Sequence, residues 1–319
     1  MADRNSALGW TAEQWDKVNG AIAESFGKAS VASELFEGDC YGPLAPSEEY
    51  VREVTLKADV PKVTVQDDLT VKLFNLTVKV ELSNEQVSEL GLSNALVAFR
   101  RAANLLAQGE DYIVFNGFAQ DEHEKTHEVA TAHAGKKPLD KKQRMALMIA
   151  SSPKGNVPGL ARLRDQSKLP KLVARYKSPA KAPTVKGAAV VEEIVKAVGA
   201  LDTGFHTQPF ACVLGMKLFE AVYSPSDSMV MPADRIKELL GPQSNRSSAR
   251  GWLLRSAQLE DYEGIVLSRA DNEIDVVVAT PPTAQLLNVT NEATYLFRVY
   301  EKFMLRIKDE TAVQRFDFE

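Results

Sequence analysis

Residues 47–82 largely alternate apolar with polar side chains. A period of two is typical of strands with one apolar face. Pro61 and the turn Gln66-Asp67-Asp68 indicate a long two-stranded excursion rather than a closed sheet. A two-stranded ribbon is only marginally stable in water, so we expect other elements or other chains to support it. This ribbon is the strongest constraint on the fold, and it is a first indication of assembly.

The amino-terminal region predicts an amphipathic helix. Thr11 and Gln14 form a capping box, because the hydroxyl of Thr11 can accept the third helical N–H while Gln14 reaches back to the cap. Trp10 and Trp15 are placed as a hydrophobic staple. The apolar stripe that follows predicts docking on the body of the same subunit, with binding of a partner peptide as an alternative role. Its members are Trp15, Val18, Ile22, Phe26 and Ala29.

The remaining periodicities predict a mixed α+β chain without an evenly spaced βαβ series. We expect a long helix over 92–115 and shorter ones over 141–150, 188–198, 216–223 and 234–240. Strands are expected over 209–214, 252–255, 264–268, 274–279 and 295–307.

Composition excludes several classes of protein. With 319 residues, 45% of them hydrophobic and 25% charged, the chain can build two compact units, which excludes disorder and disulfide scaffolds. It shows neither an apolar run of membrane-spanning length nor a signal-peptide core near Met1, so we expect a cytoplasmic protein. The only cysteines, Cys40 and Cys212, lie far apart, which suits a reducing compartment and excludes a four-cysteine metal site.

Several segments, in order along the chain, resemble the encapsulins, bacterial nanocompartment shell proteins with the tailed-phage major-capsid (Hong Kong 97-type) fold. The most specific is 110–117, Glu-Asp-Tyr-Ile-Val-Phe-Asn-Gly, which is similar to the end of that family's spine helix. Two departures are the Thr-Pro-Pro-Thr at 280–283, in place of a family motif, and extra sequence between Gly117 and Gly155. The other similar segments are 11–15, 41–44, 155–160, 208–214 and 295–313.

The resemblance implies a domain plan. It consists of an arm (1–46), an extended loop (47–82), a peripheral domain (83–159) with a spine helix and an insertion (118–154), an axial domain (160–286), and a carboxy-terminal strand (287–319) that returns to the peripheral domain.

It also implies a function: self-assembly into an icosahedral nanocompartment that encloses a cargo protein, with neither an enzyme activity nor a cofactor. The targeting peptide of the cargo would dock in an apolar groove beside the first helix, with Ile22, Phe26 and Leu35 as candidate contacts. The alternative within the same fold is a phage or prophage capsid protein that packages DNA.

A function of another class is suggested by His123-Glu124-Lys125-Thr126-His127, formally the zinc-metallopeptidase pattern HExxH. On a helix this spacing places His123 and His127 one turn apart to hold zinc. Charged neighbours surround the pair, and the sequence defines no third ligand, so the pattern favours a coincidental, solvated loop or helix. His206 is interpreted as a structural histidine.

Residues 136–186 contain fourteen Lys and Arg residues against two Asp, although the whole chain has a net charge of -5. Such a block suits a solvated loop or salt bridges between subunits. It also suits binding of nucleic acid or another polyanion, or docking of acidic cargo. Tyr176 is its only aromatic residue, which does not fit a base-stacking platform.

Overall fold

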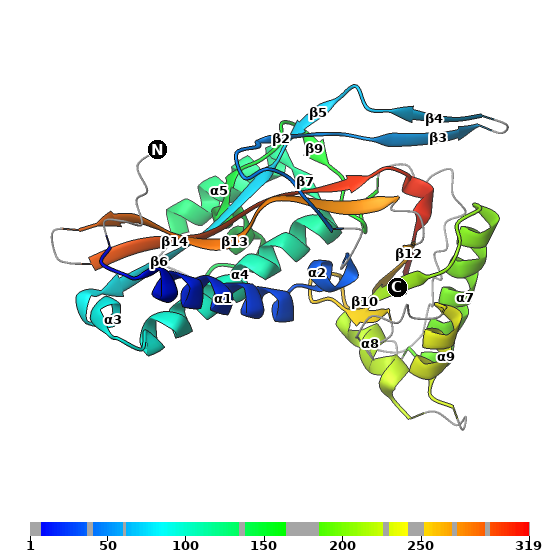
Figure 1. The fold of residues 1–319 in the computed structure, drawn as a ribbon. Helices are drawn as coiled ribbons and strands as arrows, with labels where there is room; N and C mark the ends of the chain where they lie inside the picture. Colours follow the sequence, from blue (N-terminus) through cyan, green and yellow to red (C-terminus); the bar gives the residue numbers. More distant parts are fainter. Residues whose placement is uncertain are drawn as a thin grey trace.

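The computed structural model describes residues 8–36, 41–59, 62–133, 138–163, 185–225, 230–241, 252–269, 273–290 and 294–318. They form an elongated chain with a five-stranded sheet in one part and a four-stranded sheet in the other (Figure 1). The predicted α+β class is confirmed. Within these ranges, no helix combines the length and apolar character that crossing a bilayer requires.

The five-stranded sheet has the order β1-β13-β14-β6-β8, and two long helices pack on it. α1 (Ala12–Ala29) begins with the predicted capping box at Thr11. The predicted staple is also confirmed, since the Trp10 and Trp15 rings lie 5.0 Å apart, and Trp10 also stacks on Phe297 at 5.3 Å. The other elements are α4 (Ser93–Asn116), β1 (Tyr41–Pro43), β6 (Phe74–Ser83), β8 (Ile149–Ser151), β13 (Ile274–Val289) and β14 (Thr294–Ile307).

β13 is ten residues longer than predicted, because the sequence indicated an end at Ala279 and the strand continues to Val289. Pro281 and Pro282 fall where the pairing with β14 shifts register, and proline is tolerated at such irregularities. β1 pairs with Val276–Val278 of β13, and α1 also packs against β13. The side-chain oxygen of Asn19 accepts hydrogen bonds from the Ala284 backbone N–H and the Thr283 hydroxyl, at 3.0 and 3.1 Å.

The four-stranded sheet has the order β11-β10-β12-β15, and three helices pack in the same unit. Its last strand, β15, follows the long β13–β14 hairpin, so the chain crosses three times between the two sheets. The boundaries expected at 160–286 and 287–319 are therefore corrected: β13 belongs to the five-stranded sheet and β15 to the four-stranded one. Alternation shows where a strand lies but not which sheet it joins. The elements are α7 (Gly187–Thr203), β10 (Phe210–Leu214), α8 (Met216–Tyr223), α9 (Pro232–Leu239), β11 (Leu253–Arg255), β12 (Glu263–Ser268) and β15 (Val313–Asp317).

The predicted ribbon is confirmed as two short antiparallel pairs that extend along and beyond the body (Figure 1). Two details differ from the prediction. Gln66-Asp67-Asp68 separates β4 from β5 instead of forming the turn. Residues 74–82, assigned to the extended loop, belong to β6, an interior strand of the sheet, because alternating apolar residues occur both in the ribbon and in the body and do not mark the boundary between them. The pairs are β2 (Tyr50–Arg52) with β5 (Thr70–Lys72) and β3 (Thr55–Asp59) with β4 (Lys62–Gln66).

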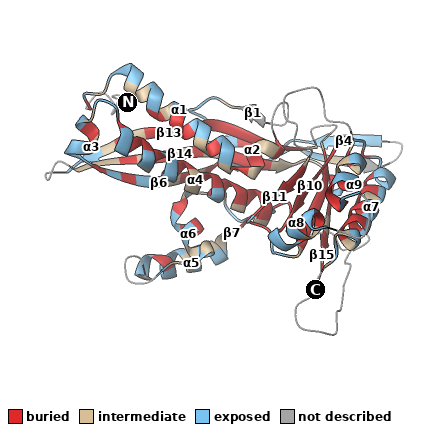
Figure 2. Cartoon of the chain, turned by 90° about the horizontal axis from the view of Figure 1, so that it is seen from below, coloured by how far each residue is buried: buried red, intermediate tan, exposed pale blue. Residues whose placement is uncertain are grey.

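The segment between Gly117 and Gly155 folds as a helical hairpin on the edge of the sheet. α5 (Gln120–His133) projects with mostly exposed side chains (Figure 2), whereas α6 (Lys141–Met148) buries Met145, Ala146 and Met148. β8 then pairs with β6 at its start. The insertion thus adds the edge strand to the sheet. The short elements still unnamed are α2 (Val31–Leu35), α3 (Asn84–Ser88), β7 (Phe118–Ala119), β9 (Asn156–Val157) and a 3-10 turn (Glu310–Ala312).

Candidate functional site

The Glu-Asp pair near the end of α4 holds the amino-terminal arm. The Asp111 carboxylate accepts hydrogen bonds from the backbone N–H groups of Val31 and Ala32 at 3.1 and 2.8 Å. The hydroxyl of Ser30 donates to Glu110 at 2.8 Å. Burial raises the pKa of Asp111 to about 7, and the hydrogen bonds from Ala32, Val31 and Ser30 oppose that shift. These two carboxyl groups connect α4 to the junction of α1 and α2.

The glycine that ends α4 allows a close backbone approach. Gly117 has a φ of 73°, and a Cβ atom there would overlap the backbone of Val157 and Gly159. Leu160 and Ala161 then donate backbone hydrogen bonds to the carbonyls of the last turns of α4, each at 2.9 Å. Two segments that resembled the encapsulins, 110–117 and 155–160, therefore meet as one structural junction.

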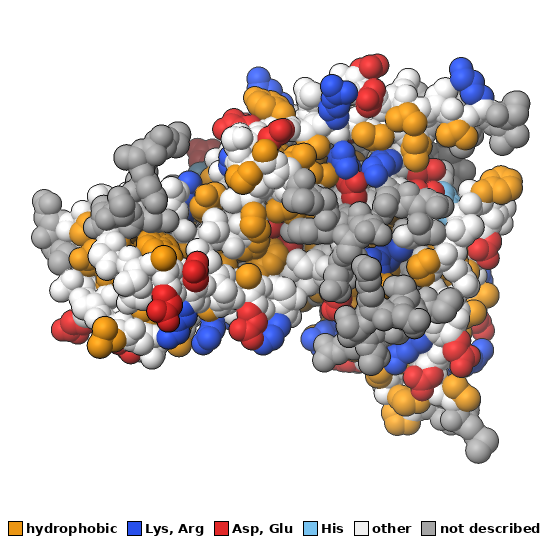
Figure 3. Space-filling model, viewed as in Figure 1, with side chains coloured by type: hydrophobic (Ala, Val, Ile, Leu, Met, Phe, Trp, Pro, Cys, Tyr) orange, Lys and Arg blue, Asp and Glu red, His pale blue; other side chains and the backbone are white. Residues whose placement is uncertain are grey.

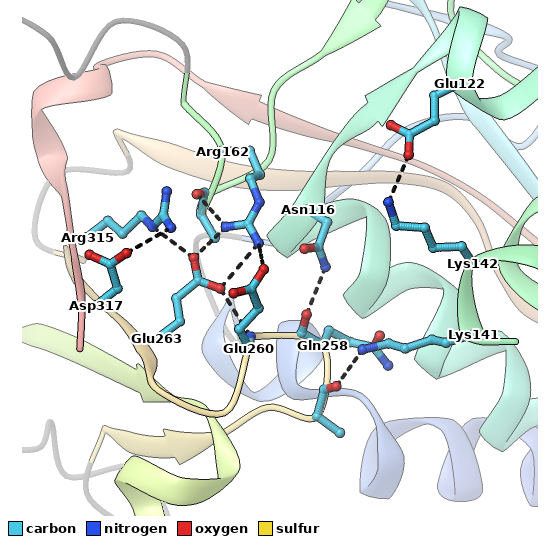
Figure 4. Close-up of polar contacts among 12 residues, drawn as sticks. Asn116, Glu122, Lys141, Lys142, Arg162, Gln258, Glu260, Glu263, Arg315 and Asp317 are labelled. Carbon is cyan, nitrogen blue, oxygen red and sulfur yellow. Dashed lines mark hydrogen bonds and ion pairs between the residues drawn. The ribbon is translucent and has the colours of Figure 1, made fainter. Parts of the chain in front are cut away.

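Charged residues connect this junction to the four-stranded sheet (Figure 4). Glu263 is buried at the start of β12, and both Arg162 and Arg315 form ion pairs with it. Asn116 donates to the carbonyl of Gln258 at 2.9 Å. Lys141 of the insertion donates to the carbonyl of Ala257 at 2.6 Å. The insertion, α4 and the loop before β12 are thus tied together.

A cleft of about 560 Å³ lies between these three elements. Glu122 and Lys142 face each other across part of it at 2.8 Å, and Arg162 also lines it (Figure 4). Burial lowers the pKa of Lys141. The charged groups that line this cleft already have partners within the chain, so its charge does not favour one class of ligand.

The ribbon presents the most unusual surface of the described residues. Its base is anchored, because Val51 is buried and Leu56 donates a backbone hydrogen bond to Lys308 at 2.7 Å. Further along, Val63, Val65 and Leu69 remain 69%, 60% and 66% exposed. Figure 3 shows apolar side chains along this edge of the molecule. Several exposed apolar side chains on one projecting element are typical of a protein interface.

The structure places the three candidate groove residues inside the subunit. Ile22, Phe26 and Leu35 are all buried in the main apolar core, where α1 packs on α4 and β13. Their side chains therefore do not line an open groove, which corrects the expectation. The apolar stripe of α1 packs within the subunit, which agrees with the predicted docking on the body of the same subunit.

His123 and His127 lie on α5, with ring centroids 5.8 Å apart. His123 packs beside Phe118 at 5.1 Å, and burial lowers the pKa of His123. In the described part of the chain, no third metal-ligating side chain joins them. The arrangement is the exposed helix that the flanking charges predicted.

Eight of the fourteen Lys and Arg residues of the basic segment 136–186 lie outside the described residues. Of the part that is described, Lys142 pairs with Glu122 and Arg162 with Glu263 inside the subunit. Cys40 also lies outside the described residues, whereas Cys212 is a buried thiol, as expected.

The sequence matches no protein-family model and no curated protein. The structure, however, is similar to the crystal structure of a virus-like particle from Pyrococcus furiosus, with a TM-score of 0.60 and 14% identity over 96% of this chain and 100% of that one. The chain has the phage major-capsid fold. Other similar structures are the holo-SrpI encapsulin complex from Synechococcus elongatus (TM-score 0.49, 11% identity, 87% of this chain and 84% of that one) and Mycobacterium phage Che8 (TM-score 0.47, 12% identity, 90% of each chain).

The resemblance predicted a spine helix, an extended loop and an axial domain, and α4, the ribbon and the four-stranded sheet lie at these places in the sequence. The assignment of these names to the elements stays a prediction. The candidate functional surface is therefore the ribbon, which shares few contacts with its own subunit.

Proposed function

We propose that the chain is the shell subunit of an encapsulin nanocompartment, which assembles in the cytoplasm from many copies of this chain and encloses a cargo protein. The observation that carries the proposal is the ribbon: Val63, Val65 and Leu69 are exposed on an element that projects from a subunit of capsid fold. The likeness to the virus-like particle, which extends over 96% of this chain and 100% of that one, supports the proposal.

Apolar burial supplies the driving force for this assembly. A Val or Leu side chain that moves from water to a packed contact stabilises it by about 1.5–3 kcal/mol. Three such residues on one ribbon, repeated in every subunit, favour the large interfaces of obligate assemblies, which bury roughly 2,000 Å² or more. An isolated subunit leaves this surface in water, whereas a neighbouring subunit covers it.

The geometry gives the alternatives less support. The pair on α5 has only two imidazoles and an exposed, charged setting, so the zinc metallopeptidase has no constellation to carry it in the described residues. A DNA-packaging capsid shares the fold and differs in its contents. The role proposed for the chain is structural and not catalytic.

The test is negative-stain electron microscopy of the main size-exclusion peak of the protein expressed alone, with the ratio of absorbance at 260 and 280 nm recorded. We expect hollow, uniform particles with a protein-like ratio. A monodisperse monomer or dimer would contradict the shell.

The contents of the particles test the cargo. Particles purified from the native host should hold a protein that resists added protease until the shell is disrupted. Nuclease-resistant DNA in its place would instead identify a capsid that packages a genome.

A further inference from the structure

A polar cluster lies beside the base of the ribbon, where the chain passes between the two sheets. His206 is on the loop between α7 and β10, Glu273 directly precedes β13, and Asp309 follows β14. One ligand-type atom of each side chain lies within 4.8 Å of those of the other two. We propose that these three residues bind a divalent transition-metal ion, with zinc as the best match.

The ligand set and its spacing suit such an ion. Zinc binds imidazole nitrogen and carboxylate oxygen at about 2.0–2.2 Å, so ligands at tetrahedral angles stand about 3.3 Å apart. In the structure, His206 Nδ1 lies 2.8 Å from Glu273 Oε1. Side-chain adjustments of about an ångström would bring all three groups into coordination distance. One imidazole with two carboxylates favours zinc or manganese over a soft ion such as Cu(I).

The environment of the Glu273 Oε2 atom also supports a bound metal ion. The Glu273 side chain is only 12% exposed, and its Oε2 atom has almost no solvent-accessible surface. Among the described residues, no hydrogen-bond donor contacts Oε2. A buried carboxylate oxygen without a partner is costly, since the charge has left water and gained nothing in return. A metal ion would supply the missing partner.

The surroundings provide both support for the ligands and a way in. The hydroxyl of Thr311 contacts His206 Nε2 at 2.9 Å and donates to Asp309 at 2.6 Å, which orients the two ligands. Asp309 and Thr311 also line a cleft of about 290 Å³ between the ribbon base and the body. This cleft gives an ion a path to the site and gives a water molecule room to serve as a fourth ligand.

The backbone already holds the ligands in place. His206 donates its backbone N–H to Leu201 at 3.0 Å, and Lys308 donates to the carbonyl of Glu273 at 2.8 Å. Ordering costs little when the ligand-bearing backbone is fixed beforehand. A bound ion would join the loop after α7 to both ends of the β13–β14 hairpin, and so would fasten the four-stranded unit to the five-stranded sheet.

The experiment uses the full-length protein, stripped with EDTA and transferred to chelator-free buffer. Zinc is added at two equivalents per chain, excess ion is removed by desalting, and bound zinc is measured by elemental analysis beside the thermal unfolding midpoint. We expect about one zinc ion per chain and a midpoint raised by several degrees. Glu273→Gln, which keeps the shape of the side chain, should lower zinc affinity at least tenfold, and Asp309→Asn should act in the same direction.

The chain offers its own control in the exposed pair on α5. The double variant His123→Ala/His127→Ala should keep the zinc content and the midpoint shift of the unaltered protein. Zinc that is lost from this double variant but retained by Glu273→Gln would overturn the proposal and place the ion on α5. Bound zinc below about one ion per ten chains in the unaltered protein would also overturn it, whatever the variants do to folding.

Discussion

The ribbon and the β6–β14 part of the long sheet have the same sequence signature but opposite environments. In β14, Phe297, Val299 and Phe303 are buried beneath helices of the same chain. In the ribbon, Val63 and Val65 alternate just as regularly and stay exposed. Alternation shows that one face of a strand will be covered, and it does not show which chain covers it. The difference separates residues that fold the subunit from residues that join subunits.

The largest effect should come from the buried side of this comparison. Phe297 is enclosed by Trp10, Trp15 and Phe99, with ring centroids 5.3–6.3 Å from its own. Phe297→Ala removes these contacts and leaves a cavity, so we expect the free energy of unfolding to fall by about 3–5 kcal/mol. Thermal unfolding and soluble yield measure the loss. An unchanged unfolding midpoint would show that the aromatic cluster does not stabilise the subunit.

Substitutions on the ribbon should impair assembly of the particles without unfolding the subunit. Val63→Asp/Val65→Asp places two charges on one face of β4, and burying them at an interface would leave each without a partner. We expect the fraction of protein in particles to fall at least tenfold, with circular dichroism unchanged, as judged by size exclusion and microscopy. Gln66→Asp puts a charge on the opposite face of the same strand and is the matched control. Particles that form normally from the double variant would remove the ribbon from the assembly interface.

A smaller effect concerns Asp111, which lies inside the subunit and links α4 to the arm. Its pKa in the folded state is about 7, above the ordinary value of 3.8, so the folded chain binds a proton that the unfolded chain has released. This contribution to stability is therefore complete below about pH 4 and is lost as pH rises to about 7. Its slope is at most about 1.4 kcal/mol per pH unit.

Asp111→Asn should flatten the dependence of the unfolding midpoint on pH between 5 and 7. Glu24→Gln is the control: Glu24 is exposed on α1, and its pKa is lowered, mainly by a hydrogen bond from Lys28, so it stays ionised in this range. An equal slope in the Asp111 variant and the unaltered protein would contradict the assignment.

The smallest effect is expected from a charge pair on the ribbon. Arg52 and Asp67 lie 3.5 Å apart with both side chains mostly exposed. Exposed ion pairs contribute about 0–1 kcal/mol because water and salt screen them. Asp67→Asn should therefore change the unfolding free energy by less than about 1 kcal/mol. If Asp67→Asn lowers the fraction of protein in particles while the free energy of unfolding of the subunit is unchanged, Asp67 faces a neighbouring subunit.

Local signals in the sequence predicted local structure well. The capping box at Thr11, the tryptophan staple and the end of α4 at Gly117 each depend on neighbours within a few residues, and the structure has all three. The partner of a strand depends on residues far away in the sequence. For this reason the sheet joined by β15, the continuation of β13 past Pro281 and the burial of Leu35 were not predicted.

The polar cluster shows the same limit at a smaller scale. His206 lies 67 residues from Glu273 and 105 from Thr311, so no spacing rule could connect them. His123 and His127 matched a known spacing, but among the described residues no third ligand joins them. The ribbon was predicted correctly because its lack of internal support is visible in the sequence itself.

The contact of Asn19 with β13 has a consequence for how copies of this chain meet. An uncovered edge strand presents unpaired backbone N–H and C=O groups, which can form hydrogen bonds with a strand of any neighbouring chain, including an incorrect partner. On one border of the long sheet, β1 pairs with Val276–Val278 and the amide of Asn19 takes the N–H of Ala284, so these positions are occupied before two copies collide. The side chain of Asn19 thereby prevents the backbone N–H of Ala284 from pairing with a strand of another subunit.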